Sequence, residues 1–290
     1  MGKVVAITNQ KGGVGKTTTA VNLAAALAVA EQRVLLIDID AQGNATSGMG
    51  LAHDQQQVGT YDLMVGRSEI AQTMRETELP FLHLIPASVD LAAVEVELVD
   101  LDDRAIRLKQ ALETVRDNYD YILIDCPPSL GLLTINALTA ADSTLIPIQC
   151  EYFALEGLGQ LLATVRLITD HLNPRLEIKG AVLTMYDSRT RLSSEVGEEV
   201  RRHLGDRVYD TIIPRSIRLS EAPSHGLPIH LFAPTSKGAE AYRDLAAEIR
   251  LRDERPGSHT PSEPGPRIGI RIHDGTSDRS MGETAMAVPA

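Results

Sequence analysis

The chain has 290 residues, of which 43% are hydrophobic and only 3% aromatic, so an aliphatic α/β core is favoured over a β-sandwich. Its net charge of −11 argues against a protein that coats nucleic acid with its whole surface, and any DNA contact must be a local patch. The sequence has no apolar run of about 18 residues and no signal-peptide core, so we expect a soluble protein. Its only cysteines, Cys126 and Cys150, suit a reducing cytoplasm, and we expect a single domain.

The first apolar run, Val4-Val5-Ala6-Ile7, predicts a buried strand, and it leads into a glycine-rich turn and a helix over residues 19–27. A strand, a glycine-rich turn and a helix in this order form an anion cradle, because unpaired N–H groups at the helix start point at bound phosphate. Lys16 suits the β- and γ-phosphates, and Thr17 suits Mg²⁺. The alternative is a glycine-rich turn without a ligand. The candidate nucleotide-binding residues are Lys11, Gly12, Gly13, Val14, Gly15, Lys16, Thr17 and Thr18.

The loop departs from the strict phosphate-loop pattern, because Gln10 stands where that pattern has glycine and Lys11 adds a second lysine. Residues 11–18, Lys-Gly-Gly-Val-Gly-Lys-Thr-Thr, resemble the deviant Walker A loop of the ParA/MinD group of P-loop ATPases. In that family the extra lysine, here Lys11, reaches across a dimer interface to the nucleotide of the other subunit. The resemblance therefore implies that ATP holds a homodimer together.

Residues 33–38 predict a second buried strand, and a polar loop over 39–46 follows at its carboxyl end, where α/β sheets place their ligands. The pattern Asp-Ile-Asp-Ala-Gln-Gly-Asn that begins at Asp38 matches the switch segment of the resembled family. The resemblance implies that Asp40 positions or activates the attacking water and that Asp38 supports the Mg²⁺ shell. The alternative for Asp40 is that it merely caps a turn.

A strand is predicted over 82–87, in which His83 alternates with apolar neighbours and is interpreted as a structural residue. Ser88 offers an N-cap to a helix that continues through Leu98. Two other helices are predicted over 60–64 and 104–115.

A third buried strand over 121–125 ends in a carboxylate, Asp125, followed by Cys126-Pro127-Pro128. P-loop enzymes hold Mg²⁺, usually through water, with an aspartate at the end of such a strand, and the Asp-x-Pro-Pro ending also matches the family. We therefore interpret Asp125 as the Walker B residue; the alternative is an ordinary strand-end aspartate. Cys126 is interpreted as a small buried hydrophobe and not as a nucleophile.

The second half of the chain continues to alternate strands with helices. Strands are predicted over 144–148, 178–185 and 208–213, and helices over 155–172 and 237–252, the last capped by Ser236. This alternation implies a doubly wound, mostly parallel sheet with helices on both faces. By resemblance, residues 151–157 line the dimer face, and the neighbourhood of Pro214 packs against the adenine.

Residues 186–218 carry seven basic and six acidic side chains, a net of +1, whereas the remaining chain carries −12. Charge counting alone favours solvated helix faces with internal ion pairs. Resemblance favours DNA contact, because the family uses arginines in the matching loops, here Arg189, Arg218 and, as a weaker candidate, Arg215. Such phosphate contacts carry no sequence information, so binding is expected to be non-specific and steeply salt-dependent.

Residues 253–290 are rich in Pro, Gly, Ser and Thr, and we expect a disordered tail after an ATPase domain over 1–252. Membrane-binding relatives of the MinD type end in a basic amphipathic helix. The composition of this tail does not favour such a helix, so membrane attachment is not expected.

Together the motifs resemble the ParA (Soj-like) partitioning ATPases. The resemblance implies an ATP- and Mg²⁺-bound homodimer that holds double-stranded DNA at the nucleoid and releases it on hydrolysis stimulated by a ParB-like centromere-binding protein. It also implies slow intrinsic hydrolysis and a role in chromosome or plasmid segregation. One alternative is a MinD-like or polar-organelle positioning ATPase. Another is a reductase of the nitrogenase iron-protein type, but Cys126 and Cys150 give little support for its cluster.

Overall fold

The computed structural model describes residues 1–51, 58–151 and 154–254. The expected tail beyond Glu254 therefore lies outside the described residues. Within the described part, no helix is both long enough and apolar enough to cross a bilayer.

One sheet organises the described residues, in the strand order β3-β4-β2-β5-β1-β6-β7-β8. All neighbouring strands are parallel except β3 and β4, which confirms the predicted doubly wound, mostly parallel sheet. The strands are β1 (Lys3–Ile7), β2 (Val34–Asp38), β3 (Arg75–Glu76), β4 (Leu82–Ile85), β5 (Tyr121–Asp125), β6 (Ser143–Gln149), β7 (Glu177–Tyr186) and β8 (Val208–Pro214).

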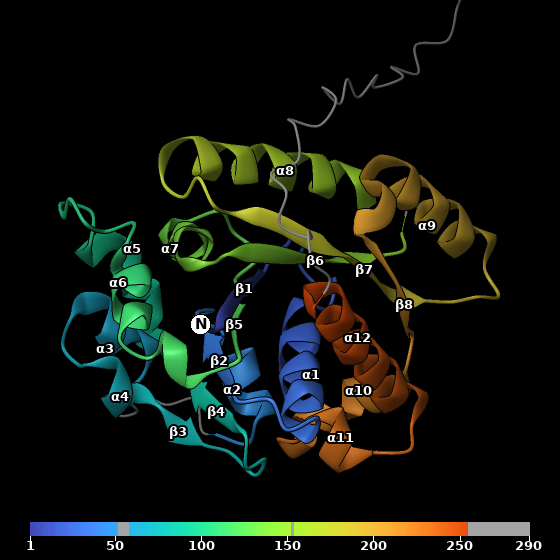
Figure 1. The fold of residues 1–290 in the computed structure, drawn as a ribbon, viewed down its shortest axis with the longest axis horizontal. Coiled ribbons are helices and arrows are strands. Elements are labelled where there is room, and N and C mark those ends of the chain that lie inside the picture. Colours follow the sequence, from blue (N-terminus) through green and yellow to red (C-terminus); the bar gives the residue numbers. More distant parts are fainter. Residues whose placement is uncertain (52–57, 152–153, 255–290) are drawn as a thin grey trace, which may run out of the picture. The chain divides into compact units, whose positions relative to one another are not determined.

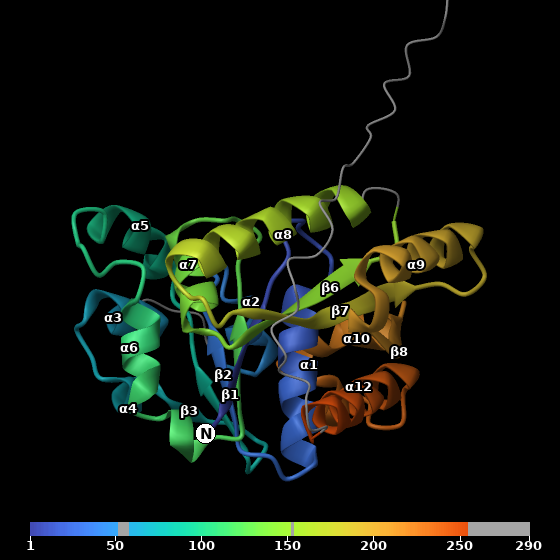
Figure 2. The same ribbon diagram turned by 45° about the horizontal axis from the view of Figure 1, so that its top comes forward.

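Helices cover both faces of this sheet, with α1 and α12 on one face and α7 and α8 on the other (Figures 1 and 2). The α-helices are α1 (Lys16–Val29), α2 (Asn44–Gly48), α3 (Thr60–Val65), α4 (Ile70–Thr73), α5 (Val94–Glu97), α6 (Arg107–Glu113), α7 (Leu132–Ala140), α8 (Ala154–His171), α9 (Arg191–Leu204), α10 (Ile217–Glu221), α11 (Ile229–Phe232) and α12 (Lys237–Glu254). The helices that the sequence did not predict are α2, α4, α7, α9, α10 and α11.

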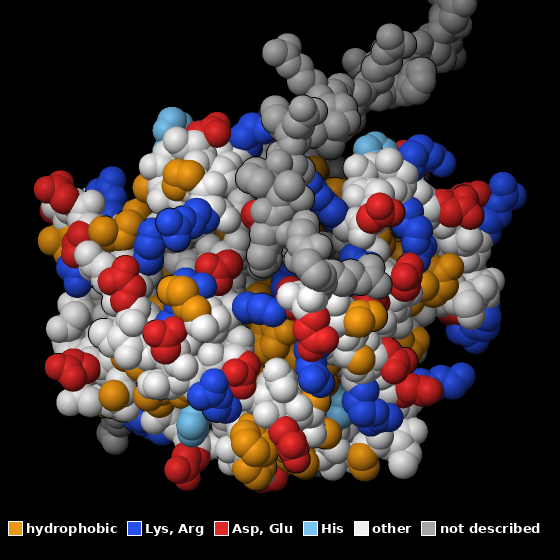
Figure 3. Space-filling view, in the orientation of Figure 1, with side chains coloured by type: hydrophobic (Ala, Val, Ile, Leu, Met, Phe, Trp, Pro, Cys, Tyr) orange, Lys and Arg blue, Asp and Glu red, His pale blue; other side chains and the backbone are white. Residues whose placement is uncertain are grey.

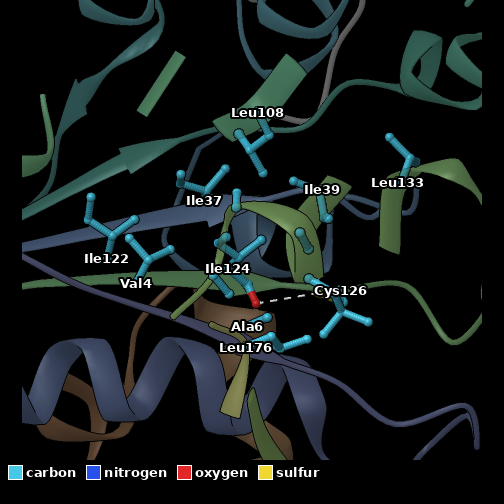
Figure 4. Packing of buried hydrophobic residues seen from close by; sticks show 14 of the residues in the cluster. Val4, Ala6, Ile37, Ile39, Leu108, Ile122, Ile124, Cys126, Leu133 and Leu176 are labelled. Carbon is cyan, nitrogen blue, oxygen red and sulfur yellow. Dashed lines mark hydrogen bonds between the residues drawn. The ribbon is translucent and has the colours of Figure 1, made fainter. Parts of the chain in front are cut away.

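The alternation of side chains along each strand divides the core into two clusters. Val4 and Ala6 of β1 belong to the cluster under α7 and α8, and Figure 4 shows them beside Ile37 and Ile124 of the neighbouring strands. Val5 and Ile7 face the opposite way, into the cluster under α1 and α12. Because both faces of the central strands are buried, these strands appear in the sequence as continuous apolar runs.

The prediction of one helix over 89–98 is wrong, because the structure has two shorter helices of different type there. A 3-10 helix (Val89–Ala93) comes first, and α5 then forms a single turn. Ser88 makes no side-chain cap; instead its carbonyl accepts a bond of 3.1 Å from the amide of Leu91, three residues on. The local backbone bond thus replaces the expected hydroxyl cap.

The last helix is capped as predicted, because the Ser236 hydroxyl accepts from the Ala239 amide at 3.2 Å. It extends to Glu254, two residues past its expected end. Asp253 explains the extension: its carboxylate contacts Lys179 Nζ at 2.6 Å, the Tyr121 hydroxyl at 2.9 Å and Lys3 Nζ at 3.3 Å. These partners come from three strands and hold the final turn of α12 against the sheet.

Candidate nucleotide-binding site

Three central strands end together at the carboxyl edge of the sheet. Asp125 at the end of β5 is in register with Ile7 of β1 on one side and with Asp38 of β2 on the other. The loop that follows β1 is the predicted phosphate loop. Parallel pairing therefore brings this loop, Asp38 and Asp125 to one place, as the sequence predicts.

Contacts with neighbouring strands fix the shape of the phosphate loop. Asn9 donates to the Pro147 carbonyl at 2.8 Å and accepts from the amide of Lys11 at 3.0 Å. On the other side, the Thr184 hydroxyl donates to the Val14 carbonyl at 2.8 Å. Neither Asn9 nor Thr184 was predicted from the sequence, because the bonds that tie them to the loop or its neighbours, Asn9 to Pro147 and Thr184 to Val14, each span more than a hundred positions.

The loop turns into α1 with its amides exposed to a ligand. Gly13 and Gly15 have φ values of +75° and +89°, which only glycine adopts at low cost. Among the described residues no acceptor is found for the amides of Gly12, Gly13 and Gly15, and a Cβ on Gly12 or Gly13 would meet nothing within 4 Å. Together with the free N–H groups of the first turn of α1, these amides form a cradle that fits a polyphosphate.

Lys16 lies buried at the start of α1, with 7% of its surface exposed. Its Nζ donates to the Lys11 carbonyl at 3.1 Å, which keeps the ammonium along the loop. Burial lowers the pKa of Lys16, and the nearby carboxylates of Asp125 and Asp40 partly oppose that effect. A cation so placed suits bound phosphate oxygens.

Lys11, the second lysine, contacts its own chain. Its Nζ lies 3.4 Å from Glu151 Oε2, and the Gln149 amide donates to the other oxygen of Glu151. The ion pair is about one-third to one-half exposed, so solvent screens it. The reach of Lys11 to a second subunit remains a prediction.

Asp125 is fully buried, and neither of its oxygens has a hydrogen-bond partner among the described residues. Burial raises its pKa well above the usual range, and the neighbouring Asp38 adds to the rise. The Thr17 hydroxyl favours the charged form, although its placement falls short of a full hydrogen bond. An orphaned buried carboxylate beside a threonine hydroxyl fits Mg²⁺, which protein sites hold with few side chains plus water and substrate phosphates.

No group of three or more His, Cys, Asp or Glu side chains suited to a metal ion occurs in the described ranges. Cys126 and Cys150 are buried free thiols, and burial raises the pKa of both. Cys126 therefore packs as the small hydrophobe that the sequence predicts.

Asp38 organises the loop that follows β2. Its Oδ2 accepts from both the amide and the hydroxyl of Thr46 at 2.8 Å, and its Oδ1 accepts from the Asp40 amide at 3.1 Å. Burial nevertheless raises the pKa of Asp38 to about 6. Thr46, which fixes this carboxylate, was not predicted from the sequence. A direct part for Asp38 in the Mg²⁺ shell stays a prediction.

Asp40 caps a turn, and the alternative that the sequence left open is that it does nothing else. Its Oδ1 accepts from the Gln42 amide at 3.0 Å, and its carbonyl accepts from the Gly43 amide at 2.8 Å. This bond uses one carboxylate oxygen and leaves Oδ2 without a protein donor among the described residues. The action of Asp40 on water is therefore compatible with the cap, and it stays a prediction.

The candidate DNA-binding arginines lie at the same edge of the sheet, Arg189 and Arg215 in two loops and Arg218 in α10. The loops follow β7 and β8, and they are joined by the Arg215 amide, which donates to the Tyr186 carbonyl at 3.1 Å. Arg189 is exposed, and its guanidinium forms two bonds with Asp187, whose pKa it lowers to about 2. Arg218 lies 2.9 Å from Glu221. The structure thus brings the arginines to two joined loops and the helix α10 that follows one of them, but gives two of them acidic partners.

The remaining sequence-predicted residue of the site, Pro214, ends β8 and is in register with Tyr186 of β7. It lies three strands from β1 in the sheet order. Its contact with adenine is not tested by this arrangement and stays a prediction.

Comparison with known proteins agrees with this geometry. The family described as "AAA domain" matches residues 2–178. The sporulation initiation inhibitor protein Soj of Bacillus subtilis is 59% identical over 249 residues, which cover 86% of this chain and 98% of that protein. The chromosome partitioning protein ParA of Caulobacter vibrioides is 53% identical and covers 87% of this chain and 95% of its own.

A solved structure named as cobyrinic acid a,c-diamide synthase of Mycobacterium smegmatis, with a bound ATP analogue and magnesium, superposes with a TM-score of 0.79. It is 38% identical and covers 90% of this chain and 99% of that chain. The phosphate loop, the strand-end carboxylates and the two partitioning relatives, matched over almost their whole length, place this chain in the ParA/Soj family of P-loop ATPases.

Proposed function

We propose that this chain is an ATP-dependent DNA partitioning protein whose ATP-bound homodimer holds DNA and releases it on hydrolysis. The single observation that carries the proposal is the meeting of a glycine-rich anion cradle, the buried Lys16 and the unpartnered carboxylate of Asp125 at one sheet edge. The names of the relatives at 59% and 53% identity support the partitioning role. The solved structure named as a diamide synthase is less similar, at 38% identity, so its name carries less weight for function.

The residues divide the chemistry as follows. The amides of the loop and Lys16 bind the phosphates of ATP, and Lys11 completes the site of the other subunit. Thr17, Asp125 and Asp38 would hold Mg²⁺, which when bound neutralises charge that develops on the phosphate oxygens. Asp40 orients the attacking water through its second carboxylate oxygen. Hydrolysis is slow until a ParB-like protein stimulates it.

Dimerisation doubles the number of arginines that face DNA. Each subunit contributes Arg189 and Arg215 from adjacent loops and Arg218 from α10, so two subunits offer six cations to the phosphate backbone. Asp187 and Glu221 now pair with two of these arginines, and DNA phosphates would compete with them. Binding is sequence-independent and nucleotide-dependent, as expected for a protein that associates with the nucleoid.

The test is co-sedimentation of the protein with double-stranded DNA of mixed sequence, with ATP and Mg²⁺ or with neither. Wild type should be retained only with ATP, and Lys16→Ala should bind neither nucleotide nor DNA. Asp40→Ala should bind ATP, hydrolyse it poorly and stay on DNA. If Asp40→Ala hydrolyses ATP at the wild-type rate, its proposed role is wrong.

A second set of variants tests the arginines. Arg189→Glu should keep ATP-driven dimers while DNA retention falls, and the matched control Arg175→Glu, outside the proposed patch, should behave as wild type. Because each phosphate contact contributes about 0.9 to the salt slope of log K, Arg218→Ala in both subunits should lower that slope by roughly 2. DNA binding by Arg189→Glu equal to wild type would remove Arg189 from the interface.

A further inference from the structure

The segment around α5 exposes hydrophobic side chains next to acidic ones. Val96, Val99 and Leu101 are 75%, 52% and 37% exposed, although they follow one another closely along the chain. At the end of the molecule where Figure 1 places α5, Figure 3 shows hydrophobic side chains among acidic and basic ones. Large apolar side chains scattered singly on a surface are ordinary, but a group in one short segment indicates an interaction site.

A second segment extends this group. The Glu95 carboxylate accepts from the Leu132 amide at 2.9 Å, which joins α5 to the start of α7. Leu130, 37% exposed, comes two residues before that contact. Gly131 permits the approach, because a Cβ there would lie 1.7 Å from Glu95 Oε1. We define the α5 surface as Val96, Val99, Leu101 and Leu130 together with Asp100 and Asp102.

The charge of the segment is strongly one-sided. Residues 89–103 contain six acidic side chains and no basic one, and Arg104, which follows, donates to the Val99 carbonyl. Within the described part of the chain, Asp100 and Asp102 have no ion-pair partner, whereas Asp103 pairs with Arg107. Exposed carboxylates beside apolar side chains attract a cation and discourage a second copy of the same surface, because a two-fold contact would place like charges together.

We propose that the α5 surface is a docking site for a basic amphipathic segment of a partner protein. Its apolar side chains would pack on Val96, Val99 and Leu130, and its lysines or arginines would pair with Asp100 and Asp102. The α5 surface involves none of the residues assigned to ATP or DNA, so this proposal stands apart from the proposed function. Through Glu95 it also contacts the start of α7, which follows the loop after Asp125.

The probe is a fluorescein-labelled 15-residue helical peptide of leucine and lysine with one apolar face, and anisotropy is measured with the full chain at about 0.15 M salt. A shuffled peptide of equal composition lacks that face. Val96→Ser with Val99→Ser, and separately Asp100→Asn with Asp102→Asn, should each weaken binding tenfold or more. The matched control combines Leu167→Ser with Asp170→Asn on α8, an exposed leucine and aspartate elsewhere, and should change affinity less than twofold.

Three results would overturn the proposal. Equal binding by all variants, or equal loss in the control, would mean that the peptide only senses the overall negative charge. Loss of a peptide-free dimer in Val96→Ser with Val99→Ser during sedimentation would make the surface a contact between copies. Tighter peptide binding by Arg267→Glu with Arg271→Glu would mean that the basic, isoleucine-rich residues 267–272 of this chain already cover the surface.

Discussion

The Asp125 carboxylate is buried without a hydrogen-bond partner among the described residues. Its burial destabilises the folded chain, but both oxygens stay available to bind an ion. Its pKa is raised, so the folded chain loses stability as the pH rises from the ordinary aspartate range towards that higher pKa. Asp125→Asn removes this loss at neutral pH. We expect the free energy of unfolding at pH 7.5, without nucleotide or Mg²⁺, to rise by about 1–3 kcal/mol in urea titrations.

The same variant should lose Mg²⁺-dependent nucleotide binding, since the amide is a poor ligand for the ion. Asp244→Asn on the exposed side of α12 is the control, and its stability should stay within about 0.5 kcal/mol of wild type. A destabilised Asp125→Asn would show that the carboxylate has partners in the folded protein that stabilise it.

In the described residues the only ion pair of Lys11 is with Glu151 of the same chain, although Lys11 is predicted to contact the nucleotide of a second subunit. If Lys11 serves the nucleotide of the other subunit, Lys11→Ala should bind ATP yet elute as a monomer from size exclusion. Glu151→Gln releases Lys11 and should strengthen the ATP-dependent dimer by about twofold to fivefold, the range for a half-exposed pair. Glu113→Gln, an exposed glutamate on α6, should change nothing; dimers in Lys11→Ala would contradict the cross-subunit role.

Among the elements, α12 supports α1, the helix that follows the phosphate loop. It packs along α1, and the hydroxyls of Tyr242 and Thr19 meet at 3.3 Å in the buried space between them. One end of α12 is capped by Ser236, and the other is held by Asp253. The helix that begins the nucleotide site is therefore positioned by the last helix described.

Removing the Ser236 cap of α12 should lower the free energy of unfolding. Ser236→Ala leaves the Ala239 amide without its acceptor, and we expect a loss of about 1 kcal/mol in the free energy of unfolding. Urea denaturation followed by circular dichroism measures it. Ser220→Ala, an exposed serine whose hydroxyl bonds only the Ser216 carbonyl within α10, should cost less than half as much. Equal losses in the two variants would argue against a special role for the cap.

For the whole molecule, His230 sets a pH dependence of stability. It is buried in α11 with neither ring nitrogen bonded, and the nearby Ala239 amide donates to Ser236 instead. Burial, and secondarily Arg243, lowers the pKa of His230 to about 4. Below about pH 6.5 this histidine is protonated in the unfolded chain but stays neutral in the folded chain. The free energy of unfolding therefore has its full value above pH 6.5 and falls as the pH decreases towards 4.

Thermal and urea unfolding between pH 7.5 and 4 should reveal this loss, about 2–3 kcal/mol for the single group. His230→Leu should remove that part of the pH dependence, because no proton is then taken up on unfolding. His203→Gln, on the exposed end of α9, should retain the wild-type curve. Curves of wild type and His230→Leu that run parallel would rule out His230 as the source.

Local sequence was sufficient for much of the fold and for the centre of the candidate site. The apolar runs that end at Ile7, Asp38 and Asp125 predict buried strands, and parallel strands bring their ends to one edge. The positive φ angles of Gly13 and Gly15 follow from a turn that glycine alone tolerates. Short-range backbone rules fix these features, and so the sequence by itself determined them.

Tertiary structure decided which side chains meet. Lys11 and Glu151 are 140 positions apart, and Thr184 reaches Val14 across 170 positions, so no local pattern signals either contact. The bond from the Leu132 amide to the Glu95 carboxylate likewise joins segments 37 positions apart. Sequence determined the elements because their causes are local, whereas the ion pair of Lys11 and the burial of Asp125 between β1 and β2 are settled only when distant strands and helices pack together.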